Sequence, residues 1–326
     1  MKVICIFDYE FSNSSGKITN ILCGTAIWTC FLILSALPVP LSMDGRLSVT
    51  AIYSSILTFY RSQRKETPME RLSQQRTSGV NSSTLRAFGI FFVVTGVFGR
   101  CILQRNLLGI GSISAEQLLE LMESSQYAMI LASISLVLQA LETCAIPIFC
   151  ALLVEGFLHT SCYYKYLLRV CGAALLSEIP YNLAMSGNFL DLSSRNPMFG
   201  LVLGLFLMFF YQRFAGKTGR NILIRLIVTV AALLWTLMLN VENGIGIIAA
   251  VAVLWAFHDK PLLRNLVGIV VMAVCSIFSP FLLASPMGFL AVHFYNGEQG
   301  NENRWINYLF YPVILAGVGI LGTYVF

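Results

Sequence analysis

The stretch YAMILASISLVLQALETCAIPIFCALLVEGFL, residues 127–158, decides the fold of this chain. Its only charged side chains are Glu142 and Glu155. Lipid offers no hydrogen-bond partners, so backbone that crosses a bilayer must be helical or part of a closed barrel. A long continuous apolar run favours helices over the short alternating segments of a barrel. Because about twenty residues cross a bilayer upright, the stretch predicts two helices broken near residues 142–147, or one strongly tilted helix.

The composition extends this interpretation to the whole chain. The 326 residues are 57% hydrophobic and only 11% charged, whereas soluble domains carry about 25% charged residues. The mean hydropathy is +0.75. We therefore predict an all-α, polytopic helical integral membrane protein with about nine to eleven transmembrane helices and the lipid bilayer as its partner. The net charge of +5 is mild and gives no argument for a nucleic-acid partner.

The chain divides into two predicted parts. Residues 1–84 form an anchor helix at 21–41 and a basic, polar linker, and residues 85–326 form a transmembrane domain. A cleaved signal is disfavoured, since no basic cluster precedes the first apolar run. Besides the stretch quoted above, the domain's spans are predicted at residues 85–103, 166–178, 198–211, 222–239, 244–257, 266–278, 280–294 and 306–324.

The loops alternate in charge. The loop after residue 211 holds Arg213, Lys217 and Arg220, whereas the loops at 188–197 and 242–243 carry little positive charge. Basic loops stay in the cytoplasm. The pattern predicts a multi-pass protein of the bacterial cytoplasmic membrane. No metal is expected, because the three histidines are scattered and the cysteines have no metal-ligand spacing.

Acidic residues inside apolar runs mark candidate functional positions. Glu155 and His159 are four residues apart, so they share one face of a helix. A histidine beside a carboxylate suits general-base catalysis, because its proton affinity lies near neutral pH. The alternative is that both side chains cap or anchor the helix end. Glu178 is followed by Ile179 and Pro180, which are expected to end its helix and leave the acid facing an interfacial loop.

A longer motif resembles a known family. The stretch IPIFCALLVEGFLHTSCYYKYLLRVCGAALLSEIPYNLAMSG, residues 146–187, resembles the TraX family, and so do YNGEQG at 295–300 and LFYP at 309–312. These are bacterial multi-spanning membrane proteins related to the conjugation protein that N-acetylates pilin. The resemblance covers roughly residues 85–326. It implies an acetyl or acyl transferase that uses acetyl-CoA on an amine or hydroxyl acceptor at the membrane, with a pilin-like protein as a possible acceptor.

Sequence and resemblance together give a predicted site. The predicted catalytic residues are Glu155 and His159. The predicted substrate-binding residues are Glu178, Tyr181, Asn182, Asn296 and Glu298. The residues predicted to bind acetyl-CoA are Arg213, Lys217 and Arg220. Counting along the helices places Glu178 on one membrane face with Asn196 and Glu242. His159 belongs to the other face, so it should not touch Glu178.

The chain also departs from the family pattern. Gly96 and Val97 stand where an Asp-His pair is expected, Glu142 and Thr143 replace a Gly-Arg pair, and Ile314 replaces a histidine after FYP. Valine cannot replace an imidazole in acid–base catalysis. A catalytically degenerate membrane scaffold is therefore a second hypothesis. A transporter, with the intramembrane glutamates as proton sites, is a third, although no inverted repeat is visible.

Overall fold

The computed structural model describes residues 79–109, 125–191, 193–298, 300 and 306–324, together with the single positions 117, 120 and 123. All of them lie in the compact unit that runs from Pro68 to Phe326. The predicted anchor helix and nearly all of the predicted linker fall outside the described residues.

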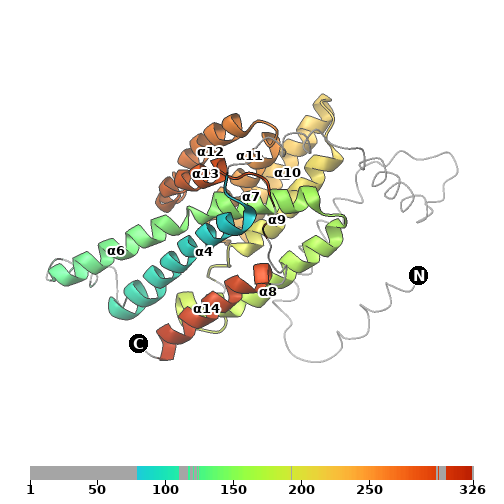
Figure 1. Cartoon of the computed structure of the whole chain (residues 1–326). Coiled ribbons are helices and arrows are strands. Elements are labelled where there is room, and N and C mark those ends of the chain that lie inside the picture. The colour runs from blue at the N-terminus through green and yellow to red at the C-terminus, as the bar shows by residue number, and fades with distance from the viewer. Residues whose placement is uncertain are drawn as a thin grey trace, which may run out of the picture. The chain divides into compact units, whose positions relative to one another are not determined.

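These residues form helices joined by turns, with isolated bridges pairing residue 80 with 295 and residue 195 with 241 (Figure 1). The all-α prediction is confirmed. The elements are α4 Ser82–Phe98, the π-helix η1 Gly99–Leu107, α6 Gln126–Glu142, α7 Ala145–His159, α8 Tyr163–Ser186, α9 Met198–Arg213, α10 Gly219–Met238, α11 Gly244–Ala256, α12 Pro261–Cys275, the 3₁₀ helix η2 Pro280–Ala284, α13 Pro286–His293 and α14 Ile306–Tyr324.

Four helical segments of the described chain are long and apolar enough to cross a membrane: Ser82–Leu107, Gln126–His159, Gly219–Met238 and Asn307–Tyr324. Within the second, the chain breaks into two helices at residues 143–144, as one sequence alternative predicted. The Thr143 hydroxyl donates to the carbonyls of Ala140 and Phe281 at this break. Pro147 lies in the first turn of α7, where its missing N–H costs no helical bond.

The predicted end of the helix at Pro180 is wrong. Helix α8 continues through Pro180 to Ser186 and ends at Gly187, whose φ of +76° is the left-handed conformation that glycine adopts readily. A proline inside a helix removes one backbone hydrogen bond. Helix α14 packs along α8, and this tertiary contact keeps the kink-prone segment helical. The predicted span at 280–294 also differs, because it divides into η2 and the short α13.

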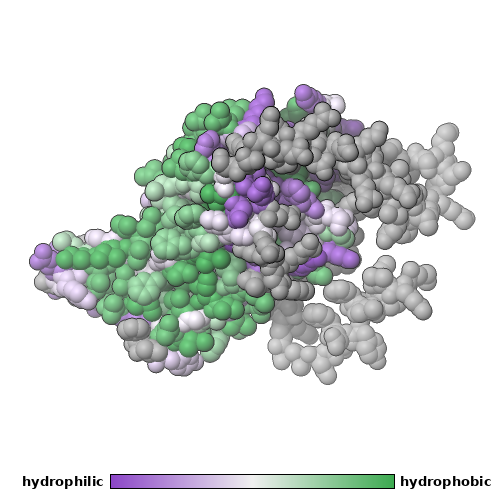
Figure 2. Space-filling model, in the orientation of Figure 1, coloured by the Kyte–Doolittle hydropathy of each residue, from purple (hydrophilic) through white to green (hydrophobic). Residues whose placement is uncertain are grey.

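Helices α7 and α11 lie at the centre of the largest core cluster, where Ile148, Leu153, Ile248, Val251 and Leu254 are buried. The lipid-facing surface is apolar. Helix α10 exposes most of its apolar residues, as expected where lipid rather than protein covers a helix. Figure 2 shows apolar residues over α4 and α6, while hydrophilic residues gather towards the end at which α4 begins and α7 ends.

That hydrophilic end is shared by several helix termini. Phe157 near the end of α7 contacts Tyr163 at the start of α8 and Trp255 near the end of α11, and Tyr163 stacks on Phe209 of α9. Most described lysines and arginines lie at this end, which we call the basic end: Arg86, Lys165, Arg169, Arg213, Lys217, Arg220, Arg225, Lys260 and Arg264. The other described arginines, Arg100, Arg105 and Arg195, lie towards the opposite end.

Candidate functional site

A buried ion network lies towards the opposite end of the bundle. Arg100 of η1 forms ion pairs with Glu142 at the end of α6 and with Glu242 in the α10–α11 turn. The side chains of all three residues are less than one-fifth exposed. Buried charges are tolerated when they are paired and hydrogen-bonded. The network therefore fixes the position of the α10–α11 turn against η1 and α6.

The network continues into α8 and the α8–α9 loop. The Tyr181 hydroxyl donates to Glu242 Oε2 at 2.8 Å and lies 3.1 Å from Ser194 Oγ. Since the tyrosine proton points to the carboxylate, the Ser194 hydroxyl donates to Tyr181. The resulting chain of hydrogen bonds runs from Ser194 through Tyr181 and Glu242 to Arg100.

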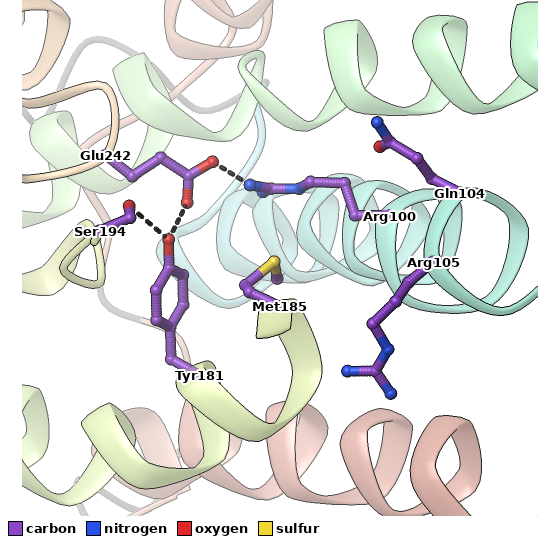
Figure 3. A pocket seen from close by; sticks show the side chains of 7 residues that line it. All are labelled: Arg100, Gln104, Arg105, Tyr181, Met185, Ser194 and Glu242. Carbon is purple, nitrogen blue, oxygen red and sulfur yellow. Dashed lines mark hydrogen bonds and ion pairs between the residues drawn. The ribbon is translucent and has the colours of Figure 1, made fainter. Parts of the chain in front are cut away.

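A cavity of about 270 Å³ lies beside this chain. Its lining residues come from η1, α8, the α8–α9 loop and the α10–α11 turn: Arg100, Gln104, Arg105, Tyr181, Met185, Ser194 and Glu242 (Figure 3). In an α-helix Arg100 and Arg105 would point about 140° apart, at 3.6 residues per turn. The π-helix bonds residues five apart, which brings both arginines to the same side. π-Helical turns occur frequently at functional sites.

Arg105 holds the end of α8. Its Nη1 donates to the carbonyl oxygens of Leu183 and Ala184 at 2.6 and 3.1 Å, and its Nη2 donates to the Thr323 hydroxyl of α14. The last carbonyls of a helix lack partners within the helix, and a cation near them also interacts favourably with the helix dipole.

Glu178 lies in a second ion pair beside the network. It is only 8% exposed and accepts from Arg195 Nη1 at 2.8 Å and from Asn196 Nδ2 at 2.9 Å. The α8–α9 loop therefore covers the acid rather than leaving it at an open interface. Asn182 is also buried, and within the described part of the chain neither polar atom of its side chain has a partner.

At the basic end, Glu155 and His159 meet on α7. Nδ1 of His159 lies 3.5 Å from Glu155 Oε2 and 2.9 Å from the Glu155 carbonyl oxygen. The His159 side chain is 52% exposed, so water reaches the ring. His258 and Arg264 also act electrostatically on Glu155. Nearby, burial and the negative charge of Glu155 raise the pKa of Tyr295, so its hydroxyl stays protonated at neutral pH.

In the comparisons with known proteins, one family model matches the chain. The family model described as TraX protein matches residues 118–322, well over half of the chain. The chain belongs to the TraX family. Neither a curated protein nor a solved structure matches it. The TraX match spans α6 to α14 but not α4 and η1, so Arg100 joins the network from outside the matched region.

The remaining predicted site residues lie at the basic end, in two separate groups. Arg213, Lys217 and Arg220 are exposed around the α9–α10 turn. Asn296 and Glu298 follow α13 and bond each other, with Asn296 Nδ2 3.1 Å from Glu298 Oε2. Within the described part of the chain, this pair forms no hydrogen bond or ion pair with Glu155 or His159.

Sequence reasoning missed Arg100, Gln104, Arg105 and Ser194 as a group, and placed Glu242 near Glu178 without naming it as a site residue. A signal was present, because Arg100 lies within the predicted span at 85–103 and intramembrane charges mark functional positions. Its partners are 42 and 142 residues away in the sequence, so no local pattern connects them.

Proposed function

We propose that this TraX-family protein is a membrane-embedded acetyl or acyl transferase of the bacterial cytoplasmic membrane. It takes acetyl from acetyl-CoA and transfers it to an amine or hydroxyl acceptor at the membrane, such as a pilin-like protein. Family membership supports the proposal. The observation that carries it is the Glu155–His159 pair, a half-exposed imidazole held by a carboxylate and a backbone carbonyl.

In the proposed mechanism, Nδ1 of His159 carries a proton directed to the Glu155 carbonyl oxygen, which leaves Nε2 unprotonated. Nε2 then takes the proton of the acceptor amine or hydroxyl as that atom attacks the thioester carbonyl. The new acyl–nitrogen or acyl–oxygen bond forms, the carbon–sulfur bond breaks, and the departing sulfur receives the proton from His159. The carboxylate of Glu155 stabilises the imidazolium that forms between these steps.

The charges of the basic end fit a cytoplasmic donor. Arginine and lysine side chains bind phosphate oxygens by charge-assisted hydrogen bonds, and acetyl-CoA carries phosphates. Arg213, Lys217 and Arg220 are exposed at the same end as His159, and the positive-inside rule assigns that end to the cytoplasm. Acetyl-CoA is found in that compartment.

A non-catalytic membrane scaffold is the second candidate, and the packing around Gly96 favours it. A Cβ atom added there would lie 2.1 Å from Glu142 Oε2 and 2.3 Å from Glu142 Cβ. No acidic or imidazole side chain fits at this position while the Arg100–Glu142 pair stands. In this alternative the buried network serves to hold the helices together.

A transfer assay separates the two candidates. Purified protein in nanodiscs is mixed with acetyl-CoA and a short peptide with a free N-terminal amine, and thiol release and peptide acetylation are measured together. We expect turnover that falls by roughly 100-fold in His159→Ala, the usual size of a general-base contribution. The control His293→Ala removes an imidazole that bonds Asn265 at the same end, and it should keep turnover within a few fold. Unchanged turnover in His159→Ala removes that residue from the mechanism, and absence of both thiol release and peptide acetylation in the wild-type protein supports the scaffold.

A further inference from the structure

The cavity beside η1 has two chemically different sides. Figure 3 shows Glu242, Ser194 and Tyr181 on one side and Gln104 and Arg105 on the other. The first side presents carboxylate and hydroxyl oxygens. The second presents an amide and a guanidinium. A cavity of about 270 Å³ with polar lining residues is close to the lower limit of small-molecule sites, which is roughly 300 Å³.

The charges around the cavity are separated in the same way. Glu142 alone neutralises Arg100, so Glu242 brings a second carboxylate to a single guanidinium. On the other side, the described hydrogen bonds of Arg105 go to carbonyl, amide and hydroxyl oxygens, which carry no net charge. Buried charges favour opposite partners. The negative side therefore suits a cation and the positive side suits an anion.

The position of the cavity relative to lipid bears on the source of such a ligand. Beyond Arg100, η1 and α6 continue side by side, with Leu108 packed on Ala128 and Ala132. The outward residues of this pair are apolar and exposed: Leu107, Tyr127, Met129, Ile130 and Ile134. The cavity therefore lies alongside a lipid-facing surface at the end away from the basic residues.

We propose that this cavity binds a zwitterion that carries a primary ammonium and a phosphate a few bonds apart, the chemistry of phosphoethanolamine. The ammonium has three N–H donors, and Glu242, Tyr181 and Ser194 offer oxygen acceptors for them. Four of the five N–H groups of Arg105 bond Asn106, Leu183, Ala184 and Thr323, and the fifth, on Nη2, donates to the phosphate. A lipid headgroup and free phosphoethanolamine share this chemistry. The proposal is independent of acetyl transfer at His159.

Binding is measured by calorimetry on the full chain in detergent micelles, with O-phosphoethanolamine and with phosphocholine as probes. Phosphocholine has the phosphate but no N–H donors, so it should bind at least about tenfold more weakly. Equal affinities for the two probes, or no binding of phosphoethanolamine, would overturn the proposal. Competition by nanodiscs of phosphatidylethanolamine, and none by phosphatidylcholine nanodiscs, assigns the lipid source. Binding that neither lipid affects assigns the free compound.

Variants test each side of the cavity. Glu242→Gln and Arg105→Gln should each weaken phosphoethanolamine binding at least about tenfold, through loss of one charge-assisted bond. Ser194→Ala removes a hydroxyl acceptor that takes no part in the ion pairs, and it should weaken phosphoethanolamine binding severalfold. This variant tests the oxygen-lined side of the cavity if Glu242→Gln does not fold. Asp259→Asn is the control, since it removes a carboxylate paired with His258 at the basic end. If the Ser194→Ala variant and the Arg105→Gln variant both bind phosphoethanolamine with wild-type affinity, the assignment is refuted.

Discussion

Replacing Arg100 by methionine should destabilise the bundle strongly. The substitution roughly keeps the length of the side chain but removes the guanidinium that pairs with Glu142 and Glu242. Two carboxylates are then left facing each other, and among the described residues the Tyr181 hydroxyl is the side-chain donor that Glu242 keeps. Hydrogen bonds to charged groups contribute about 1.5–3 kcal/mol each, and breaking a buried ion pair costs about 3–5 kcal/mol. We expect a loss of about 3–5 kcal/mol in the free energy of unfolding.

The assay is equilibrium unfolding by denaturing detergent, followed by circular dichroism in mixed micelles. Arg105→Met is the matched control, because it lines the same cavity but leaves no carboxylate unpaired, and it should cost about 1–2 kcal/mol. A triple variant that adds Glu142→Met and Glu242→Gln to Arg100→Met should recover most of the loss, since no unpaired buried charge remains. A loss below about 1 kcal/mol for Arg100→Met, or a triple variant as unstable as the single one, would refute the reasoning.

Three further predictions concern packing, topology and hydrogen bonding. Gly288→Ala should destabilise the protein by about 1–3 kcal/mol in the same unfolding assay, because the added Cβ would lie 2.1 Å from the Cys144 carbonyl oxygen. The control Gly317→Ala should be neutral or stabilising, because a Cβ added there meets no atom within 4 Å. In a variant that keeps only Cys162, a membrane-impermeant thiol reagent should label inverted vesicles and not intact cells, and labelling of intact cells would invert the topology. Tyr181→Phe should cost about 1 kcal/mol or more, because Glu242 loses a donor, and an unchanged free energy of unfolding would show that water replaces the hydroxyl.

Much of the fold follows from hydropathy, because lipid forces each apolar run into a helix. The last span was predicted at residues 306–324, and α14 has these bounds. The error at Pro180 has a physical origin: local sequence disfavours a helix there, but packing of α14 against α8 overrides that preference. The local sequence shows the proline, but it does not show that α14 packs against this part of α8.

The candidate site was predictable only in part. Alternating spans placed Glu178 near Asn196, and their 2.9 Å hydrogen bond confirms this grouping. The roles predicted for Glu155 and His159 remain proposals. The cavity beside Arg100 was not predicted, because it depends on a π-helix that turns Arg105 to the same side. The prediction assumed 3.6 residues per helical turn, so it could not place side chains correctly where the helix is locally wound as a π-helix.

The π-helix makes the length of one short segment a functional variable. Deleting a single residue within Gly99–Leu107 would allow the segment to close as an ordinary α-helix, without opening a loop. After a deletion between Arg100 and Arg105, the α-helix would place Arg105 four residues from Arg100, about 40° around the helix axis at 3.6 residues per turn. The helix would survive, and Arg105, the residue that fastens α8 to α14, would stay on the same side as Arg100. A relative with one residue fewer between Arg100 and Arg105 should therefore join those two helix ends in the same way through an ordinary α-helix, whereas the same number of residues wound as an α-helix would turn Arg105 about 140° away from Arg100.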